Sequence, residues 1–127
     1  MTLLVSGGFT AFVAPIAERI GFERFEANVL GVRDGRLTGR TEGRIVDSRR
    51  KHDVLSEARD QLGLAAGDTM AIGDGANDIP MIEEAGLGIA YRAKAALAAV
   101  ADARLDHHGL DALLWAQGIP RSQWVEG

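Results

Sequence analysis

The most informative stretch of the chain is Thr69–Met81, which reads TMAIGDGANDIPM. Its first residues are mostly apolar and run into a glycine, as expected of a buried strand in a parallel sheet. The turn that follows, Gly73–Asp78, combines two glycines with two aspartates and an asparagine. Apolar residues resume at Ile79, so the stretch predicts a strand, a polar turn and a helix in succession.

Strand and helix signals alternate along the rest of the chain. Short apolar runs predict strands, apolar residues at spacings of three and four predict helices, and glycines predict helix ends. An Asp34-Gly35 pair between two strand-like runs predicts a β-hairpin. We therefore predict a single α/β domain over residues 1–127, with a doubly wound, mainly parallel sheet, helices on both faces and one hairpin. The predicted strands are 2–5, 27–32, 37–39, 69–72 and 87–90, and the predicted helices are 9–20, 47–62, 79–85, 93–101 and 109–117.

The composition limits the classes of function. A hydrophobic content of 46% and a charged content of 25% are typical of a soluble globular protein. The net charge of −4 indicates no nucleic-acid partner, and the lack of cysteine excludes disulfides and thiolate metal sites. We expect a cytoplasmic protein with no membrane partner and no signal peptide, because no apolar run is long enough and Gly7-Gly8 interrupts the apolar start.

The Gly73–Asp78 turn is a candidate site for a cation and a phosphate. Ligands of parallel sheets gather at the carboxyl ends of the strands, and Asp74 directly follows a predicted strand. Mg²⁺ is the ion that such a carboxylate favours. Asn77 can donate to a phosphate oxygen, and Asp78 can cap the next helix or accept a hydrogen bond behind the metal. The alternative is a glycine-rich turn with a capping aspartate.

Ser6-Gly7-Gly8 follows another predicted strand and precedes a helix. The Ser6 hydroxyl and the Gly7 N–H can bind a phosphate oxygen there. The simpler alternative is a turn or a helix cap.

Lys51 belongs to a basic run with Arg49 and Arg50, in the first turn of the predicted helix 47–62. A solvated helix face is the simpler interpretation of such a run. A single lysine could instead enter the site and neutralise phosphoryl charge, in which case we expect Arg49 and Arg50 to lie on the surface.

In order and spacing, these motifs resemble the haloacid dehalogenase superfamily, and most closely its phosphoserine phosphatase group. The resemblance is carried by Ser6–Phe9, Lys51 and Gly73–Asp78, and also by Ala27–Gly39 and Gly86–Lys94. It implies a Rossmann-like core and a Mg²⁺-dependent hydrolase of L-serine biosynthesis. The implied substrate is a small phosphorylated metabolite, phosphoserine, which would be hydrolysed through a phospho-aspartyl intermediate.

The resemblance also implies a role for each matched residue. Ser6 and the Gly7 N–H would bind the phosphate, and Lys51 would stabilise charge on the phosphoryl group and the nucleophile. Asp74 would ligate Mg²⁺, and Asn77 would contact the phosphate region of the substrate. Asp78 would support the metal site or Lys51. These roles match what phosphoryl transfer needs, which is charge neutralisation and positioning.

One part of the family pattern has no counterpart in the sequence. The family carries its nucleophile and its general acid on an Asp-x-Asp-Gly-Thr loop, and its substrate-reading residues on a cap segment; this chain contains neither. The resemblance therefore implies the carboxyl-terminal portion of a phosphoserine phosphatase-type enzyme, which we predict to be inactive alone. The alternatives are a non-catalytic module that binds Mg²⁺ or phosphate or has a regulatory role, and half of an active site that another chain completes.

The resemblance further implies that the sheet is incomplete. In the family, the missing loop ends a central strand that lies between the strands before Ser6 and before Gly73. Without it, each of these strands would have an unpaired edge. We expect them to pair directly with each other, to self-associate, or to take a strand from a partner.

Overall fold

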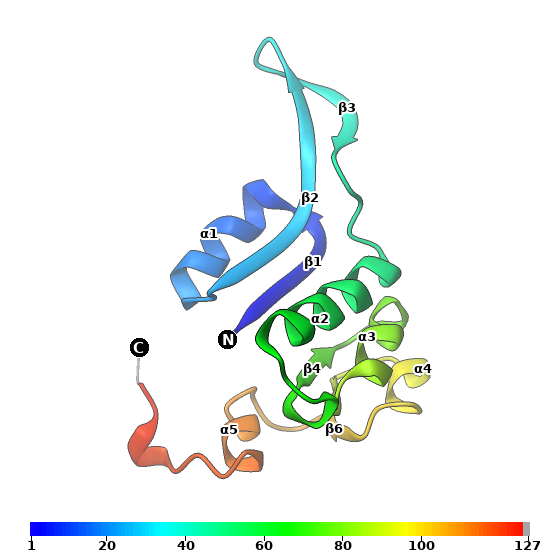
Figure 1. Cartoon of the computed structure of the whole chain (residues 1–127). Coiled ribbons are helices and arrows are strands. Elements are labelled where there is room, and N and C mark those ends of the chain that lie inside the picture. The colour runs from blue at the N-terminus through cyan, green and yellow to red at the C-terminus, as the bar shows by residue number, and fades with distance from the viewer. Residues whose placement is uncertain (126–127) are drawn as a thin grey trace.

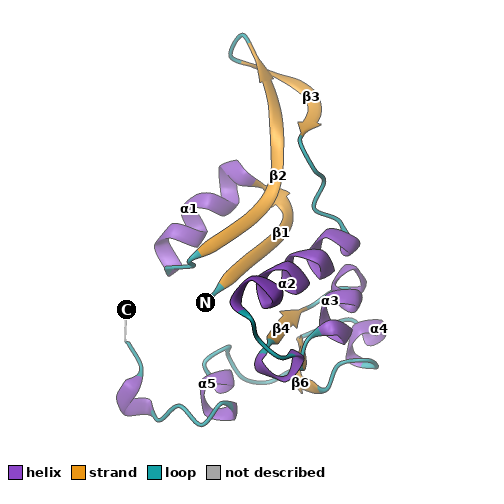
Figure 2. Cartoon of the chain, viewed as in Figure 1, coloured by secondary structure: helices purple, strands orange, loops and turns teal. Residues whose placement is uncertain are grey.

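The computed structural model describes residues 1–125. The strands are β1 (Leu3–Phe9), β2 (Arg24–Arg33), β3 (Arg36–Glu42), β4 (Met70–Gly73), β5 (Leu87–Tyr91) and β6 (Ala103–Leu105). The α-helices are α1 (Thr10–Ile20), α2 (Ser48–Leu62), α3 (Ile79–Glu84), α4 (Ala95–Ala98) and α5 (Ala112–Ala116). Short 3-10 turns are η1 (Ala66–Asp68), η2 (Ala76–Asp78) and η3 (Arg121–Gln123). The α/β class with mainly parallel pairing is confirmed, and Figures 1 and 2 show the arrangement.

The strands form two separate sheets of three, ordered β1-β2-β3 and β4-β5-β6. In the first sheet β1 and β2 are parallel, and α1 makes the crossover between them. The pair β2–β3 is antiparallel and forms the predicted hairpin, which extends away from the body in Figure 1. Asp34 and Gly35 make its turn with φ of +52° and +73°, values that a two-residue hairpin loop requires.

The second sheet is parallel throughout and contains the best-packed core. Its main cluster joins Ala71 and Ala90 of the strands to Ile82 of α3 and Leu97 of α4, all of them buried. Gly88 of β5 is required for this packing, because a Cβ built there would lie 2.4 Å from the Ile82 carbonyl oxygen. This close approach fixes α3, and therefore the turn before it, against the sheet.

Helix α2 joins the two sheets. Its start is capped by Asp47, whose Oδ1 accepts a hydrogen bond of 2.8 Å from the Arg50 N–H, and its end is Gly63 in the left-handed conformation. Figure 1 shows α1 and α2 on opposite sides of β1 and β2, so the prediction of helices on both faces is confirmed. In the part of the chain described by the structure, no helix has the length and apolar character of a membrane span.

Several predictions about the elements were wrong. Ser6-Gly7-Gly8 lies inside β1 and not in a loop after it, although the pairing with β2 becomes irregular between Ser6 and Phe9. The helix predicted over 93–101 is only Ala95–Ala98, the last helix is Ala112–Ala116, and β6 was not predicted. The alanine-rich run gives way to β6 because Asp102 exchanges two hydrogen bonds with the Gly88 backbone, at 2.7 and 2.9 Å.

Direct pairing between the two sheets does not occur among residues 1–125. The described pairing of β1 is with β2, and that of β4 is with β5. Of the three outcomes expected for an incomplete sheet, self-association and a partner strand remain.

Candidate functional site

The candidate site lies at the carboxyl end of β4, where the chain turns into η2 and α3. Gly73 ends the strand in very close contact with Asp78, since a Cβ at Gly73 would lie 2.5 Å from the Asp78 Cβ. Gly75 leaves similar room for Asn77, whose Oδ1 would lie 2.7 Å from an added Cβ. Gly73 is therefore needed for the turn to close on the buried Asp78, whereas the exposed Asn77 side chain could move away from a side chain at position 75.

Asp78 is the centre of the turn and is only 4% exposed. Its Oδ2 accepts hydrogen bonds from the Asp74 N–H at 3.1 Å and from the Gly75 N–H at 3.2 Å. Its Oδ1 accepts from the Lys51 ammonium at 2.6 Å. This carboxylate thus fixes the backbone of the turn and binds the first turn of α2 to it.

Lys51 is only 7% exposed, so the alternative of a solvated helix face does not apply to it. A buried ammonium needs a charged partner, and Asp78 supplies one. The structure therefore brings together Lys51 and Asp78, which are 27 positions apart in the sequence.

Asp74 and Asn77 are the exposed members of the turn. No hydrogen bond or ion pair of either side chain is found within residues 1–125, in contrast to the saturated Asp78. The Asp74 backbone is nonetheless fixed at both ends, because its N–H donates to Asp78 and its carbonyl accepts from the Lys94 N–H at 3.1 Å. Asp74 lines a shallow pocket of about 280 Å³ with Ile72, Gly73, Tyr91, Arg92 and Leu110.

The Ser6–Gly8 segment lies at the carboxyl end of β1. The Ser6 Oγ accepts a hydrogen bond of 3.0 Å from the Gly8 N–H, and Gly7 is exposed. Gly7 also approaches the chain that enters α2, since a Cβ there would lie 3.7 Å from the Val46 carbonyl oxygen. This segment and Lys51 thus belong to the same end of the molecule.

Asn28 connects the Ser6–Gly8 segment to the chain that enters α2, and it was not predicted as a site residue. Its Nδ2 donates to the Gly7 carbonyl at 2.8 Å, and its Oδ1 accepts from the Val46 N–H at 2.8 Å. The only sequence signal was an amide within the otherwise apolar run 27–32. Because a buried amide must be hydrogen-bonded, such a residue marks a junction. Here the junction positions the Ser6–Gly8 segment relative to α2.

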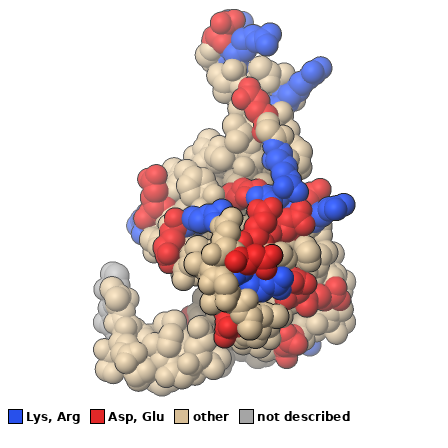
Figure 3. Space-filling view, viewed as in Figure 1, with Lys and Arg blue, Asp and Glu red and all other residues tan. Residues whose placement is uncertain are grey.

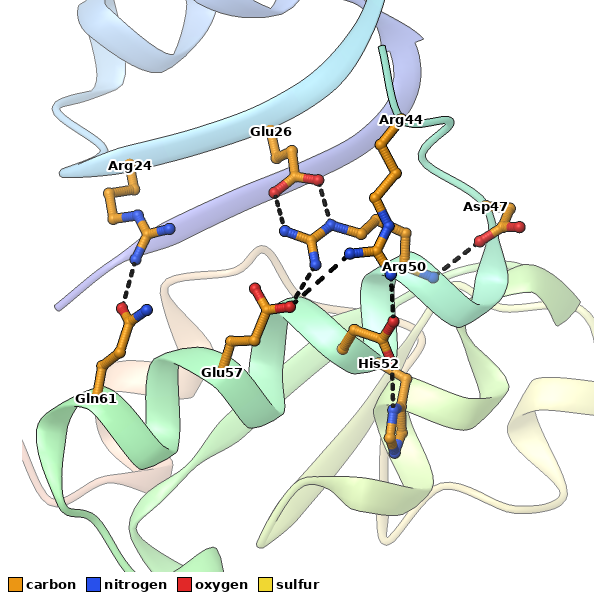
Figure 4. A network of polar contacts seen from close by, with 9 residues as sticks. Arg24, Glu26, Arg44, Asp47, Arg50, His52, Glu57 and Gln61 are labelled. Carbon is orange, nitrogen blue, oxygen red and sulfur yellow. Dashed lines mark hydrogen bonds and ion pairs between the residues drawn. The ribbon is translucent and has the colours of Figure 1, made fainter.

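The prediction that Arg50 lies on the surface is wrong, because its side chain is largely buried. Figure 4 shows that the Arg50 guanidinium donates two parallel hydrogen bonds to the Glu26 carboxylate of β2, one of them at 2.7 Å. Its third nitrogen donates to the Glu57 carboxylate at 2.7 Å. These bonds, Glu26 first, raise the pKa of Arg50. Figure 4 also shows Arg24 of β2 donating to Gln61 of α2, so polar contacts connect α2 to the first sheet along its length.

Two carboxylates that bind arginines of α2, Glu57 of α2 itself and Glu84 of α3, make folding sensitive to acid. The hydrogen bond from Arg59 lowers the pKa of Glu84, and the one from Arg50 lowers the pKa of Glu57. A carboxylate whose pKa is depressed on folding stabilises the native state above its ordinary value of 4.5, and this stabilisation is lost as the pH falls through the depressed value. We expect the free energy of unfolding to decrease as the pH falls below 4.5.

Urea unfolding over this pH range measures the effect. Arg59→Gln should flatten the pH dependence, because Glu84 then titrates closer to its ordinary value. The matched control is Arg33→Gln in the exposed hairpin. Equal slopes for the parent chain and the Arg59 variant would contradict this assignment.

A metal ion would find a limited set of ligands here. No cluster of three or more carboxylate or histidine side chains occurs within the described range 1–125. Asp78 is fully used by Lys51 and two N–H groups, which leaves the Asp74 carboxylate free. A single carboxylate suits Mg²⁺, which keeps several waters and often takes its remaining ligands from substrate phosphates. The residues present therefore fit one part of a Mg²⁺ site.

The sequence comparison decides the family. The model of haloacid dehalogenase-like hydrolases matches residues 1–83, well over half of the chain. This chain belongs to the haloacid dehalogenase-like hydrolase family. The matched region contains Ser6, Lys51 and the whole Gly73–Asp78 turn.

This haloacid dehalogenase-like hydrolase is similar to phosphoserine phosphatases. Phosphoserine phosphatase SerB2 of Mycobacterium tuberculosis is 45% identical over 120 residues, covering 94% of this chain and 29% of the relative. The Albidiferax ferrireducens phosphoserine phosphatase is 45% identical over 116 residues, covering 88% and 49%. The solved phospho-aspartyl intermediate analogue of a phosphoserine phosphatase has a TM-score of 0.82 at 40% identity, covering 90% of this chain and 55% of that one. The chain spans half or less of the length of these two curated relatives.

Proposed function

We propose that this chain provides one half of the active site of a Mg²⁺-dependent phosphoserine phosphatase. The observation that carries the proposal is the buried Lys51–Asp78 pair, which holds a free Asp74 at the carboxyl end of β4. Similarity to phosphoserine phosphatases over 94% of the chain supports phosphoserine as the substrate. A cytoplasmic setting within L-serine biosynthesis is part of the same proposal.

Each residue of the site has a role in this proposal. The Ser6 hydroxyl and the Gly7 N–H bind phosphate oxygens, and Asn77 orients the substrate phosphate. Lys51 lowers the energy of negative charge on the phosphoryl group, while Asp78 keeps Lys51 in place. Asp74 holds Mg²⁺, which neutralises phosphoryl charge when it is bound.

The remaining requirement is a nucleophile, which we propose comes from polypeptide outside these 127 residues. A carboxylate oxygen would attack phosphorus while the bond to the seryl oxygen breaks and that oxygen takes a proton. Water would then cleave the acyl phosphate to give inorganic phosphate and the free carboxylate. Asp78 cannot attack, because both of its oxygens are occupied by hydrogen bonds within a buried pair. A solved phosphoserine phosphatase described as a phospho-aspartyl intermediate analogue supports this route.

Reconstitution tests the proposal. The residues of the Albidiferax ferrireducens relative that lie outside the matched region can be produced separately and mixed with this chain. We expect Mg²⁺-dependent hydrolysis of phosphoserine to appear on mixing and to be abolished by Asp74→Ala. Asp68→Ala, an aspartate at η1 outside the proposed site, is the matched control and should keep the activity. Activity that survives Asp74→Ala would contradict the proposed metal site.

A second candidate function is a non-catalytic module that binds Mg²⁺ or phosphate. Asp74 is the single free carboxylate of the turn, and this favours the binding module over catalysis by the chain alone. The two functions differ in reconstitution, since a binding module gains no hydrolysis on mixing.

Weak Mg²⁺ binding by the isolated chain is expected in either case. With Asp74 as the only free carboxylate of the turn, calorimetry should leave the binding curve unsaturated at roughly millimolar Mg²⁺. The matched control is Asp74→Asn, which should remove the remaining heat of binding. A micromolar or tighter dissociation constant would mean that other ligands complete the site within this chain.

A further inference from the structure

A single short segment connects the first sheet to α2. Residues 1–42 contain β1, α1, β2 and β3, and residues 47–125 contain α2 and every later element. The segment 43–46 between them begins with Gly43, which has a φ of +72° and no atom within 4 Å of a Cβ built there. A glycine in the left-handed conformation with open space around it is suited to be a hinge. The chain therefore has two contiguous parts that are joined at one place.

The larger core belongs to the second part, residues 47–125. Within residues 1–125, both clusters of buried apolar side chains lie there, one between β4, β5, α3 and α4 and the other between β5, β6 and α5. The buried apolar residues of the first part are small and belong to neither cluster; they are Val13, Ala17 and Ala27. Because apolar burial is the main term that holds a fold together, the second part is the better stabilised of the two.

Polar side chains make the contacts between β2 and α2. We name this set the polar interface, and its members are Arg24, Glu26, Arg50, Glu57 and Gln61. Figure 4 shows them in the space between the strand and the helix. The Arg50 side chain is 11% exposed, but its partners Glu26 and Glu57 are 28% and 47% exposed. Water and salt can therefore compete for these ion pairs.

Apolar contact across the same face is limited. Leu3 and Val5 of β1 are the parallel pairing partners of Arg24 and Glu26, so their side chains project from the same face of the sheet. Both are only half-buried. The polar interface thus carries a large share of the attachment between the first sheet and α2.

The boundary between the two parts runs through the candidate site. The Ser6–Gly8 segment belongs to the first part, whereas Lys51 and Asp74 belong to the second. Asn28 of the first part accepts a hydrogen bond from Val46, which is buried just before α2. A rotation at Gly43 would break this bond together with the polar interface, and it would move Ser6–Gly8 away from Lys51.

We propose that the polar interface is a salt-sensitive contact that controls assembly of the candidate site. When its ion pairs are screened, residues 1–42 turn about Gly43 as one body. The closed form holds Ser6–Gly8 beside the start of α2, and the open form separates them. The consequence for phosphate binding rests on the proposed function, whereas the motion itself does not.

Distances between spin labels test the motion. The chain has no cysteine, so two introduced cysteines can be labelled selectively. One pair spans the two parts, with Glu18→Cys on α1 and Lys94→Cys after β5, both at exposed positions. The control pair lies within the second part, with Asp60→Cys on α2 and the same Lys94→Cys. Electron paramagnetic resonance measures both distance distributions as NaCl is raised.

We expect salt to change only the pair that spans the two parts. Raising NaCl from about 0.05 M to about 0.5 M shortens the Debye length to below about 5 Å, and the mean distance from position 18 to position 94 should change by about 5 Å or more. The distance from position 60 to position 94 should stay constant. Arg50→Met should give the changed distribution already at low salt, and Arg49→Met, at the exposed neighbouring position, should not.

Each other outcome overturns the proposal. A spanning distance that responds neither to salt nor to Arg50→Met would mean that the two parts form one rigid body. Equal changes in both pairs would mean that salt loosens the whole fold, and an undiminished salt response in Arg50→Met would mean that other groups hold the parts together. The salt series needs no substitution at the polar interface, so it decides the question even where Arg50→Met unfolds. None of these measurements involves Mg²⁺, phosphate or hydrolysis, so failure here is distinct from failure of the proposed function.

Discussion

Lys51→Met is expected to destabilise the fold by about 3–5 kcal/mol, the largest effect of any single substitution considered. The substitution leaves the buried Asp78 carboxylate without the ammonium that now lies 2.6 Å from its Oδ1. Asp78 must then take up a proton or pull away from the Asp74 and Gly75 N–H groups, and either response loosens the turn. Urea denaturation at neutral pH, or a thermal melt followed by circular dichroism, measures the loss.

The controls separate the buried pair from a general effect of losing a lysine. The chain has one other lysine, the exposed Lys94, and Lys94→Met should change stability by less than about 0.5 kcal/mol. Adding Asp78→Asn to Lys51→Met removes the orphaned charge and should recover a substantial part of the stability. A Lys51→Met chain as stable as the Lys94→Met chain would show that the pair does not hold the turn.

Arg50→Met is expected to cost about 2 kcal/mol, allowing for the partial exposure of its acidic partners. It removes the guanidinium that joins Glu26 of β2 to Glu57 of α2. The two carboxylates are then left facing each other without a cation between them. We also expect a steeper loss of stability with added salt in the parent chain than in the variant, because the ion pairs are screened.

Arg49→Met is the matched control for Arg50→Met. Arg49 is the adjacent residue of the same helix turn and is exposed. Figure 3 shows charged side chains of both signs gathered over α2, with others on the hairpin. Its loss should be nearly neutral. Equal destabilisation by the two substitutions would mean that net charge, and not the Glu26 contact, links α2 to the first sheet.

Most elements of the fold could be predicted because their signals are local. The Asp34-Gly35 turn acts within a few residues, and the structure contains the hairpin that it predicts. Helix α2 lies where the helix 47–62 was predicted, and local signals, the Asp47 cap and Gly63, set its ends. The helix predicted over 93–101 is too long, because the helix propensity of this run competes with a contact to a residue distant in the sequence. Asp102 forms a hydrogen bond with the Gly88 backbone, and the chain then continues as β6 beside β5. No residue near Asp102 in the sequence predicts this pairing.

The residue types of the candidate site could be predicted from the sequence, but the directions in which its side chains point could not. In the run Arg49–Lys51 each residue points about 100° further around the helix, a consequence of 3.6 residues per turn. Lys51 therefore faces Asp78, Arg50 faces Glu26 and Arg49 faces solvent. A sequence shows that three cations are adjacent, but which of them turn inwards depends on the strands that pack against the helix. Asn28 was missed for the same reason, since both of its partners are at least 18 positions away.

The most direct test of the half-site is phosphoserine hydrolysis by the pure 127-residue chain in the presence of Mg²⁺. Lys51 and a Mg²⁺ ion held by Asp74 would neutralise phosphoryl charge, but they provide no nucleophile, so we predict release of phosphate no faster than in buffer. Mg²⁺-dependent hydrolysis by the chain alone, abolished by Asp74→Ala, would contradict this account and place a nucleophile among these residues.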